Sequence, residues 1–163
     1  MYQDTIKQKP IIIWFTGLSA SGKSTLSNAL EIELNSKGYK TYTLDEQDRD
    51  ENIREVAQLA QKLLKKGVIV ITAFISPFKK DRKFARSLVK KGEFIEIFVD
   101  TPLEICEKRD SNGVYKKARA GEIEDFIYER PRTPEIKITR FENINENVSM
   151  IISYIELFTA QKE

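Results

Sequence analysis

Apolar residues occur along the chain in two alternating patterns. Some form short continuous runs, typical of strands buried on both faces of a parallel sheet, such as IIIWFT at residues 11–16. Others recur every three or four positions, typical of helices that bury one face, such as Leu26, Leu30 and Leu34. The predicted strands are residues 11–16, 39–44, 68–74, 94–99 and 135–139. The predicted helices are residues 23–38, 53–67 and 79–91, a helix that starts at 101–104, and one around 148–155.

The alternation of strands and helices predicts a single α/β domain over residues 1–163. Strand–helix–strand units of this length have right-handed crossovers, so we expect a parallel sheet of about five strands with helices on both faces. In such a sheet, ligands bind beyond the carboxyl ends of the strands. The segments expected at that edge are residues 17–24, 45–49, 74–80 and those from 100 onward.

Two segments in the second half of the chain have distinct local patterns. Thr101, Pro102 and Glu104 form a capping box with proline at the first helical position, which predicts a well-defined helix start. Residues 110–132 are polar and basic, contain glycines and a proline, and follow no sustained period. We expect short helical pieces and a mobile loop there, which would close as a basic lid over a bound ligand.

Composition excludes several classes of protein. Lys and Arg number 27 against 25 Asp and Glu, so a net charge of +2 provides no general attraction for nucleic acid or an anionic membrane. The chain has no histidine and one cysteine, Cys106, which excludes histidine-based triads, histidine-ligated metals and an internal disulfide. The polar first residues and the lack of an apolar run near ~20 residues predict a cytoplasmic protein that spans no membrane.

A phosphate-binding motif lies between the first predicted strand and the first predicted helix. Residues 17–24 read GLSASGKS, which matches G-x-x-x-x-G-K-[ST]. Backbone N–H groups of such a loop surround a polyphosphate at the positive end of the helix, the lysine reaches the β and γ oxygens, and the last hydroxyl binds Mg²⁺. A glycine turn that happens to carry a lysine is the alternative, but the flanking elements favour a nucleoside triphosphate. The motif therefore predicts a nucleoside triphosphate with Mg²⁺ as the ligand of a three-layer P-loop fold.

Switches, motors and small-molecule kinases all use this loop. A GTPase is expected to carry an N-K-x-D base-reading signature, which the chain lacks, and a motor needs a larger chain. A small kinase needs an acceptor site on the same sheet edge and a basic lid over the phosphates. Lys116, Lys117 and Arg119 offer such a lid, so the size and the lid favour a kinase.

Five segments taken together resemble the adenylylsulfate kinase family. They are the phosphate loop, DRDENIR at 48–54, ITAFISP at 71–77, FVDTPLE at 98–104 and YKKARAGEI at 115–123. The resemblance spans nearly the whole chain and is far more specific than the phosphate loop alone. It implies transfer of the γ-phosphoryl group of ATP to the 3′-hydroxyl of a 5′-modified nucleotide. In the family's main activity the acceptor is adenosine 5′-phosphosulfate and the product is 3′-phosphoadenylyl sulfate.

The resemblance also implies roles for individual residues. The residues implied to bind ATP are Gly17, Ser19, Ala20, Ser21, Gly22, Lys23, Ser24, Thr25 and Arg109. The residues implied to bind the acceptor nucleotide are Arg49, Asn52, Phe74, Ile75 and Lys117. Arg49 would supply charge-assisted hydrogen bonds to the anionic end of the acceptor, Phe74 would stack on its base and Arg109 would pack against the donor adenine.

Catalysis would rest on Lys23, Asp45, Ser76 and Lys116, with Ser24 and Asp45 as Mg²⁺ ligands. Ser76 matches a serine that the family has been proposed to phosphorylate as an intermediate. In-line transfer between two bound nucleotides, however, depends on positioning and electrostatics more than on a covalent relay.

Structural alternatives compete with several of these roles. Arg49 could instead be a solvated residue of a helix surface, and the basic run around Lys116 could be a solvated loop. Phe74 could equally be a core residue at a strand end. Cys106 is expected to be a small buried hydrophobe and Trp14 to lie in the core.

The chain departs from the family pattern on the acceptor side. The family usually continues the second strand into a D-G-D-x-x-R block, whereas here Asp45 runs straight into Glu46 and the DRDENIR segment. A second shortening lies between Phe126 and Tyr128, where the family has a T-G-I-D-S-like loop. Asp45 then remains as the carboxylate that orients the acceptor hydroxyl or binds Mg²⁺, with Glu46 as the second candidate.

These shortenings leave the acceptor open to alternatives. Some relatives of adenylylsulfate kinase phosphorylate cytidine diphosphoramidate during capsule decoration, and a remodelled pocket would suit that change. A non-catalytic ATP-binding subunit that kept only the donor site is a third hypothesis. The expected partners are a small nucleotide acceptor and, as in the family, a second copy of the chain in a homodimer.

Overall fold

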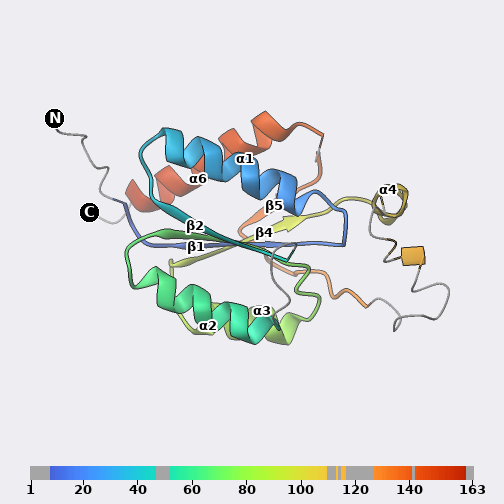
Figure 1. Ribbon diagram of the computed structural model, residues 1–163, viewed down its shortest axis with the longest axis horizontal. Helices are drawn as coiled ribbons and strands as arrows, with labels where there is room; N and C mark the ends of the chain where they lie inside the picture. The colour runs from blue at the N-terminus through green and yellow to red at the C-terminus, as the bar shows by residue number, and fades with distance from the viewer. Residues whose placement is uncertain are drawn as a thin grey trace.

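A parallel five-stranded sheet forms the centre of the structure (Figure 1), a computed structural model that describes residues 8–46, 52–109, 113, 115–116, 127–140 and 142–160. The strands are β1 (Ile12–Thr16), β2 (Thr41–Asp45), β3 (Ile69–Ala73), β4 (Phe94–Val99) and β5 (Ile136–Ile138). The helices are α1 (Lys23–Ser36), α2 (Ile53–Leu64), α3 (Lys79–Ser87), α4 (Leu103–Lys108) and α6 (Ile144–Ala160). All five predicted strands are present, each within two residues of its predicted bounds.

The order of strands in the sheet is β2-β3-β1-β4-β5, and every neighbouring pair is parallel. The chain passes from β1 to one side through β2 and β3, and then crosses to the other side through β4 and β5. The carboxyl end of β1 therefore lies at the point where the direction of winding reverses, which is where open α/β sheets bind ligands. The predicted three-layer α/β fold is confirmed.

Two helical layers cover the sheet, with α1 and α6 on one face and α2 and α3 on the other (Figure 1). The side chains of β1 alternate between the two layers, because successive residues of a strand point to opposite faces. Ile13 and Phe15 pack with α1 and α6, whereas Ile12 and Trp14 pack with α2 and α3. All four side chains are buried, which explains the unbroken apolar run in the sequence.

Helix α3 is shorter than its predicted range of 79–91. It ends at Ser87, and the chain then turns through Gly92, whose φ is +93°. The carboxylate of Glu93 accepts a hydrogen bond from the backbone N–H of Lys90 at 2.8 Å, and this local turn competes with helix continuation.

The predicted capping box at Thr101 is wrong. Helix α4 begins at Leu103, Pro102 occupies the cap position, and no side chain caps the helix. The Thr101 hydroxyl instead donates a 2.6 Å hydrogen bond to the backbone carbonyl of Ser21 in the phosphate loop. A long-range contact thus uses the hydroxyl that the local pattern had assigned to the helix.

Candidate active site

The phosphate loop connects the carboxyl end of β1 to the first residue of α1, as the motif predicts. The loop passes so close to β4 that a Cβ atom on Gly17 would lie 2.7 Å from the backbone oxygen of Val99 and 2.9 Å from Oγ of Ser21. Gly22 has a φ of +107°, which favours glycine, and Ala20 also lies in the left-handed region at +63°. The loop therefore has the tight curvature that directs backbone N–H groups inward.

Lys23 is buried in this loop, with 3% of its surface exposed. Its Nζ donates hydrogen bonds to the backbone oxygens of Gly17 at 3.1 Å and Leu18 at 2.9 Å, and lies 3.5 Å from Oε1 of Glu46. Burial lowers the pKa of Lys23, and the neighbouring Glu46 opposes that change. The loop thus encloses a poorly solvated cation, whose attraction for phosphate oxygens is stronger than in water.

Ser24 and Asp45 form the oxygen-rich part of the loop. The Ser24 hydroxyl donates a 3.1 Å hydrogen bond to Oδ1 of Asp45, which is 5% exposed at the end of β2. Mg²⁺ prefers oxygen ligands and is usually held by one or two protein groups, phosphates and water. Within the described part of the chain no cluster of three or more acidic, His or Cys side chains could bind a metal without such help. The pair fits Mg²⁺ that arrives with a nucleotide.

The remaining loop residues contribute through their backbone and position. The Ser19 carbonyl accepts a 2.8 Å hydrogen bond from the hydroxyl of Tyr115, so the start of the basic segment docks on the loop. The Ser21 hydroxyl is buried and has no hydrogen-bond partner among the described residues, which leaves a donor for a bound group. Thr25 is exposed at the start of α1.

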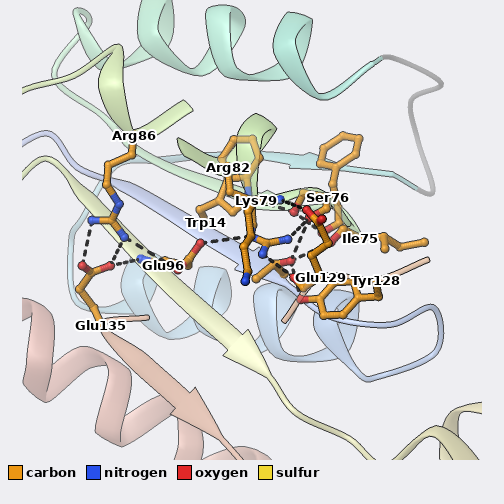
Figure 2. Close-up of polar contacts among 12 residues, drawn as sticks. Trp14, Ile75, Ser76, Lys79, Arg82, Arg86, Glu96, Tyr128, Glu129 and Glu135 are labelled. Atoms are coloured by element: carbon orange, nitrogen blue, oxygen red, sulfur yellow. Dashed lines mark hydrogen bonds and ion pairs between the residues drawn. The ribbon is translucent and has the colours of Figure 1, made fainter. Parts of the chain in front are cut away.

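The segment that follows β3, residues 74–77, contains predicted acceptor residues and is called the acceptor wall. Figure 2 shows Ile75 and Ser76 of this segment beside Tyr128. The N–H of Ile75 donates a 2.9 Å hydrogen bond to Oε2 of Glu46, and the Ile75 carbonyl accepts one of 2.7 Å from the hydroxyl of Thr16. Glu46 therefore bridges the buried Lys23 of the phosphate loop and the segment that was predicted to bind the acceptor. The sequence suggested Glu46 only as a second carboxylate, and the structure makes it the link between the two walls.

Phe74 and Ser76 are both buried in this segment. Phe74 is 3% exposed and packs with the core under α2 and α3, so the core alternative describes its position in this structure, and base stacking stays a prediction. Oγ of Ser76 accepts a 3.0 Å hydrogen bond from Nε1 of Trp14 and is fully enclosed. A hydroxyl in this position has a structural partner and no exposure to a phosphoryl donor.

We expect Ser76→Ala to keep kcat within about tenfold of the parent, because transfer between bound nucleotides needs no covalent relay. Its thermal stability should fall, since the variant leaves the buried N–H of Trp14 without a partner at a cost of ~1–3 kcal/mol. Combining it with Trp14→Phe, which removes the unpaired donor, should show coupling between the two sites. Loss of all turnover in a folded Ser76→Ala protein would instead support a phosphoserine intermediate.

Other predicted site residues are further from this centre or outside the described residues. Asn52 is exposed and its side chain caps α2 by accepting a 2.9 Å hydrogen bond from the N–H of Glu55, so acceptor binding by Asn52 stays a prediction. Arg109 is exposed at the end of α4, and Lys116 is exposed one residue after Tyr115. Arg49 and Lys117 lie outside the described residues, as does most of the predicted lid at 110–132.

Sequence reasoning missed three residues beside the acceptor wall: Arg82, Tyr128 and Glu129. Arg82 is 3% exposed in α3, although charged residues on helices are usually solvated. One signal was available, because Arg82 lies three positions before the buried Ala85 and so shares its face of the helix. Tyr128 and Glu129 had no signal, since they lie within the basic segment 110–132, which follows no sustained period.

No helix in the described residues is long and apolar enough to span a membrane.

The sequence is similar to those of adenylylsulfate kinases over most of its length. A model of the family described as Adenylylsulphate kinase matches residues 9–139. The chain is 46% identical to the adenylyl-sulfate kinase of Marinobacter nauticus over 170 aligned positions, covering 91% of this chain and 85% of the relative. It is 49% identical to that of Prochlorococcus marinus, covering 89% and 83%. Since 170 positions exceed the 163 residues of the chain, the first relative has residues without a counterpart here.

Solved structures show the same likeness. The structure of the APS kinase of Mycobacterium tuberculosis in complex with AMPPNP and APS superposes with a TM-score of 0.81 at 34% identity, covering 91% of this chain and 99% of that one. A gluconokinase from Sinorhizobium meliloti shares the fold alone, with a TM-score of 0.63 at 16% identity, covering 96% and 99%.

Proposed function

The chain belongs to the adenylylsulphate kinase family, and from this membership and the site geometry we propose that it transfers the γ-phosphoryl group of ATP to the 3′-hydroxyl of adenosine 5′-phosphosulfate. The products are ADP and 3′-phosphoadenylyl sulfate. The observation that carries the proposal is the bridge made by Glu46, which contacts Lys23 at 3.5 Å and the N–H of Ile75 at 2.9 Å. Glu46 therefore connects the phosphate loop, where ATP binds, with the acceptor wall at one edge of the sheet.

The phosphate loop supplies binding and charge stabilisation. Its N–H groups and the N-terminus of α1 hold the phosphates, and Lys23 stabilises the negative charge on the transferred group. Ser24 and Asp45 would hold Mg²⁺, which would neutralise part of the charge on the phosphates. Because Lys23 is buried, this stabilisation acts in a site with little competing water.

The acceptor hydroxyl is oriented by the carboxylates at the end of β2, Asp45 and Glu46. Asp45 is engaged with Ser24, whereas Glu46 faces the Ile75 backbone, so the two side chains divide the donor and acceptor sides. Phosphoryl transfer needs little covalent chemistry from the protein once the hydroxyl is aligned with the γ-phosphorus. Lys116 and Lys117 remain proposed closing residues of the basic lid.

Cytidine diphosphoramidate is the second candidate acceptor. The observation that favours it is the gapped match to the family, because the 170-position alignment exceeds the length of this chain. Sequence comparison with the family pattern puts the shortenings after Asp45 and between Phe126 and Tyr128, both on the acceptor side. A smaller or differently shaped base pocket would follow from such losses.

A direct acceptor assay tests the proposal. Purified full-length protein with ATP and Mg²⁺ is expected to release ADP and form a 3′-phosphorylated product when adenosine 5′-phosphosulfate is added, as resolved by anion-exchange chromatography. Faster turnover of cytidine diphosphoramidate would identify the second acceptor instead. Tight ATP binding by calorimetry with no transfer to either nucleotide would overturn both kinase assignments and support the non-catalytic subunit.

We also propose that the enzyme acts in the cytoplasm, where ATP is available, and as a homodimer. Exposed apolar side chains on the layer formed by α1 and α6 support self-association. They are Ile32 in α1 and Leu157 in α6, which are 70% and 65% exposed. Sedimentation velocity of the parent and of Ile32→Lys with Leu157→Lys is expected to show a dimer that the double variant loses. A parent that sediments as a monomer at micromolar concentration would remove the dimer.

A further inference from the structure

Two segments far apart in the sequence are joined beside the acceptor wall (Figure 2). The N–H of Glu129 donates a 2.8 Å hydrogen bond to the carbonyl of Pro77, and Oε1 of Glu129 accepts one of 2.8 Å from the N–H of Lys79. Phe78, the residue that precedes α3, offers no side-chain cap. The Glu129 carboxylate therefore caps α3 from another part of the chain, at the end of the helix that favours negative charge.

Arg82 lies at the centre of this connection. We call the contacts among residues 76–79, Arg82 and residues 128–129 the 77–129 junction. Its Nη1 donates a 2.6 Å hydrogen bond to the Ser76 carbonyl, and its Nη2 donates to the Glu129 carbonyl. Its Nε lies 3.5 Å from Oε2 of Glu96 in β4, and the guanidinium stands 5.6 Å from the ring centroid of Tyr128. The planar fork of an arginine can engage two carbonyls and a carboxylate at once, whereas a lysine ammonium has no such fixed geometry.

The junction contains charges that are expensive to bury. Arg82 is 3% exposed and Glu96 is 8% exposed, and burial raises the pKa of Glu96 against the opposing effect of Arg82 and Arg86. A buried ion pair is seldom more stabilising than an apolar pair of similar volume. The charges are therefore better explained by the directional contacts that Arg82 makes than by a gain in stability.

Backbone strain marks the same place. Ser76 has a φ of +42°, a left-handed conformation that costs a non-glycine residue about 1–2 kcal/mol. Several hydrogen bonds hold it. Nε1 of Trp14 donates to its hydroxyl, which in turn donates to the Phe74 carbonyl, and both Arg82 and the Thr16 hydroxyl donate to its carbonyl. Ser76 shares a peptide group with Ile75, whose carbonyl accepts a hydrogen bond from Thr16 and whose N–H donates to Glu46, so the strained residue lies directly beside the backbone that faces the site.

Tyr128 extends the connection to β1. Its hydroxyl lies 2.8 Å from Oγ1 of Thr16, which also donates to the Ile75 carbonyl. Burial raises the pKa of Tyr128 to about 12, so the phenol keeps its proton at physiological pH. One network therefore joins Thr16 at the end of β1, the segment after β3 and residues 128–129.

We propose that Arg82 is a positioning residue for the acceptor nucleotide, which it serves by locking the Ile75–Ser76 backbone to residues 128–129. The proposal rests on the phosphoryl transfer assigned above, since it concerns the acceptor of that reaction. The side chain of Arg82 contacts Ser76 in the acceptor wall, residues 128–129 and Glu96 in β4. None of its described contacts reaches the phosphate loop. Loss of the fork should therefore weaken acceptor binding while ATP binding persists.

The test compares Arg82→Lys with Arg86→Lys. Arg86 is also an arginine of α3 with carboxylate partners, since it pairs with Glu135 at 2.7 Å, but no described contact joins it to Ser76 or Glu129. We expect Arg82→Lys to raise the KM for the acceptor at least ~10-fold, as when a buried polar group loses its partner, and to leave the KM for ATP within about twofold. Arg86→Lys is expected to change neither KM.

Hydrogen exchange provides a readout that does not require turnover. Amides of residues 75, 76, 78, 79 and 128–130 should exchange faster in Arg82→Lys than in the parent, and at parental rates in Arg86→Lys. If Arg82→Lys does not fold, Glu129→Ala, whose substituted side chain is exposed, should loosen the same junction and raise the acceptor KM.

Two negative results are distinguishable. An active parent whose Arg82→Lys variant keeps the parental acceptor KM, or loses only thermal stability, overturns the role of Arg82 and leaves the kinase assignment intact. A parent that turns over neither acceptor overturns the proposed function itself, and with it the role assigned to Arg82.

Discussion

Lys23→Ala is expected to reduce phosphoryl transfer at least ~10³-fold, which is the scale on which a cation at the transferred phosphoryl group acts. The expectation follows from the burial of Lys23, at 3% exposed, in a loop where few waters can replace its charge. Initial rates of ADP release at saturating ATP and acceptor measure the loss. The fold should persist, because the variant removes a desolvated charge and keeps the glycines that shape the loop.

Lys37→Ala is the matched control for this variant. Lys37 follows the last residue of the same helix and is exposed, so its replacement should leave the rate within about twofold of the parent. Circular dichroism and thermal unfolding of both variants separate catalytic loss from unfolding. A folded Lys23→Ala protein with the parental rate would contradict the role of Lys23 and would weaken the assignment of the loop as a phosphate site.

Asp45→Asn is expected to reduce turnover by about 10²–10⁴-fold and to raise the Mg²⁺ concentration needed for half-maximal rate. The asparagine can still accept the hydrogen bond from Ser24, so the variant removes charge with little change of shape. Rates measured across a Mg²⁺ titration at fixed ATP separate weakened metal binding, which high Mg²⁺ relieves, from a loss of orientation at the acceptor hydroxyl, which it does not.

Two further carboxylate variants serve as comparisons for Asp45→Asn. Asp81→Asn removes a carboxylate of α3 that pairs with the half-exposed Arg54 of α2, and should change neither the rate nor the Mg²⁺ dependence. Glu46→Gln should leave the Mg²⁺ dependence unchanged and lower kcat, because Glu46 faces Ile75 and Lys23. If Glu46→Gln and not Asp45→Asn changed the Mg²⁺ dependence, the roles of the two carboxylates would have to be exchanged.

Local patterns were sufficient where the interactions themselves are local. The apolar run of β1 predicts a strand buried on both faces because each residue meets one helical layer or the other. The phosphate loop is readable for the same reason, since its curvature depends on Gly17, Gly22 and the start of the following helix. Even here Thr101 was misassigned, because its hydroxyl bonds to Ser21, a residue 80 positions away.

Side chains at the acceptor wall were harder to predict. Phe74 fits both a core and a base-stacking residue, and its 3% exposure in the core cluster follows from the packing of α2 and α3. Glu46 was ranked behind Asp45 because nothing near it in the sequence shows that the Ile75 N–H, 29 positions away, lies within hydrogen-bond distance.

Sequence patterns established the succession of strands and helices along the chain, the phosphate loop with Lys23 and Ser24, and the family to which the chain belongs. The burial of Arg82, the bridge made by Glu46 and the capping of α3 by Glu129 depend on tertiary packing. A charged residue on a helix resembles a solvated one until packing removes the water around it. Partners that replace that water come from strands and loops distant in the chain, and no local pattern encodes them.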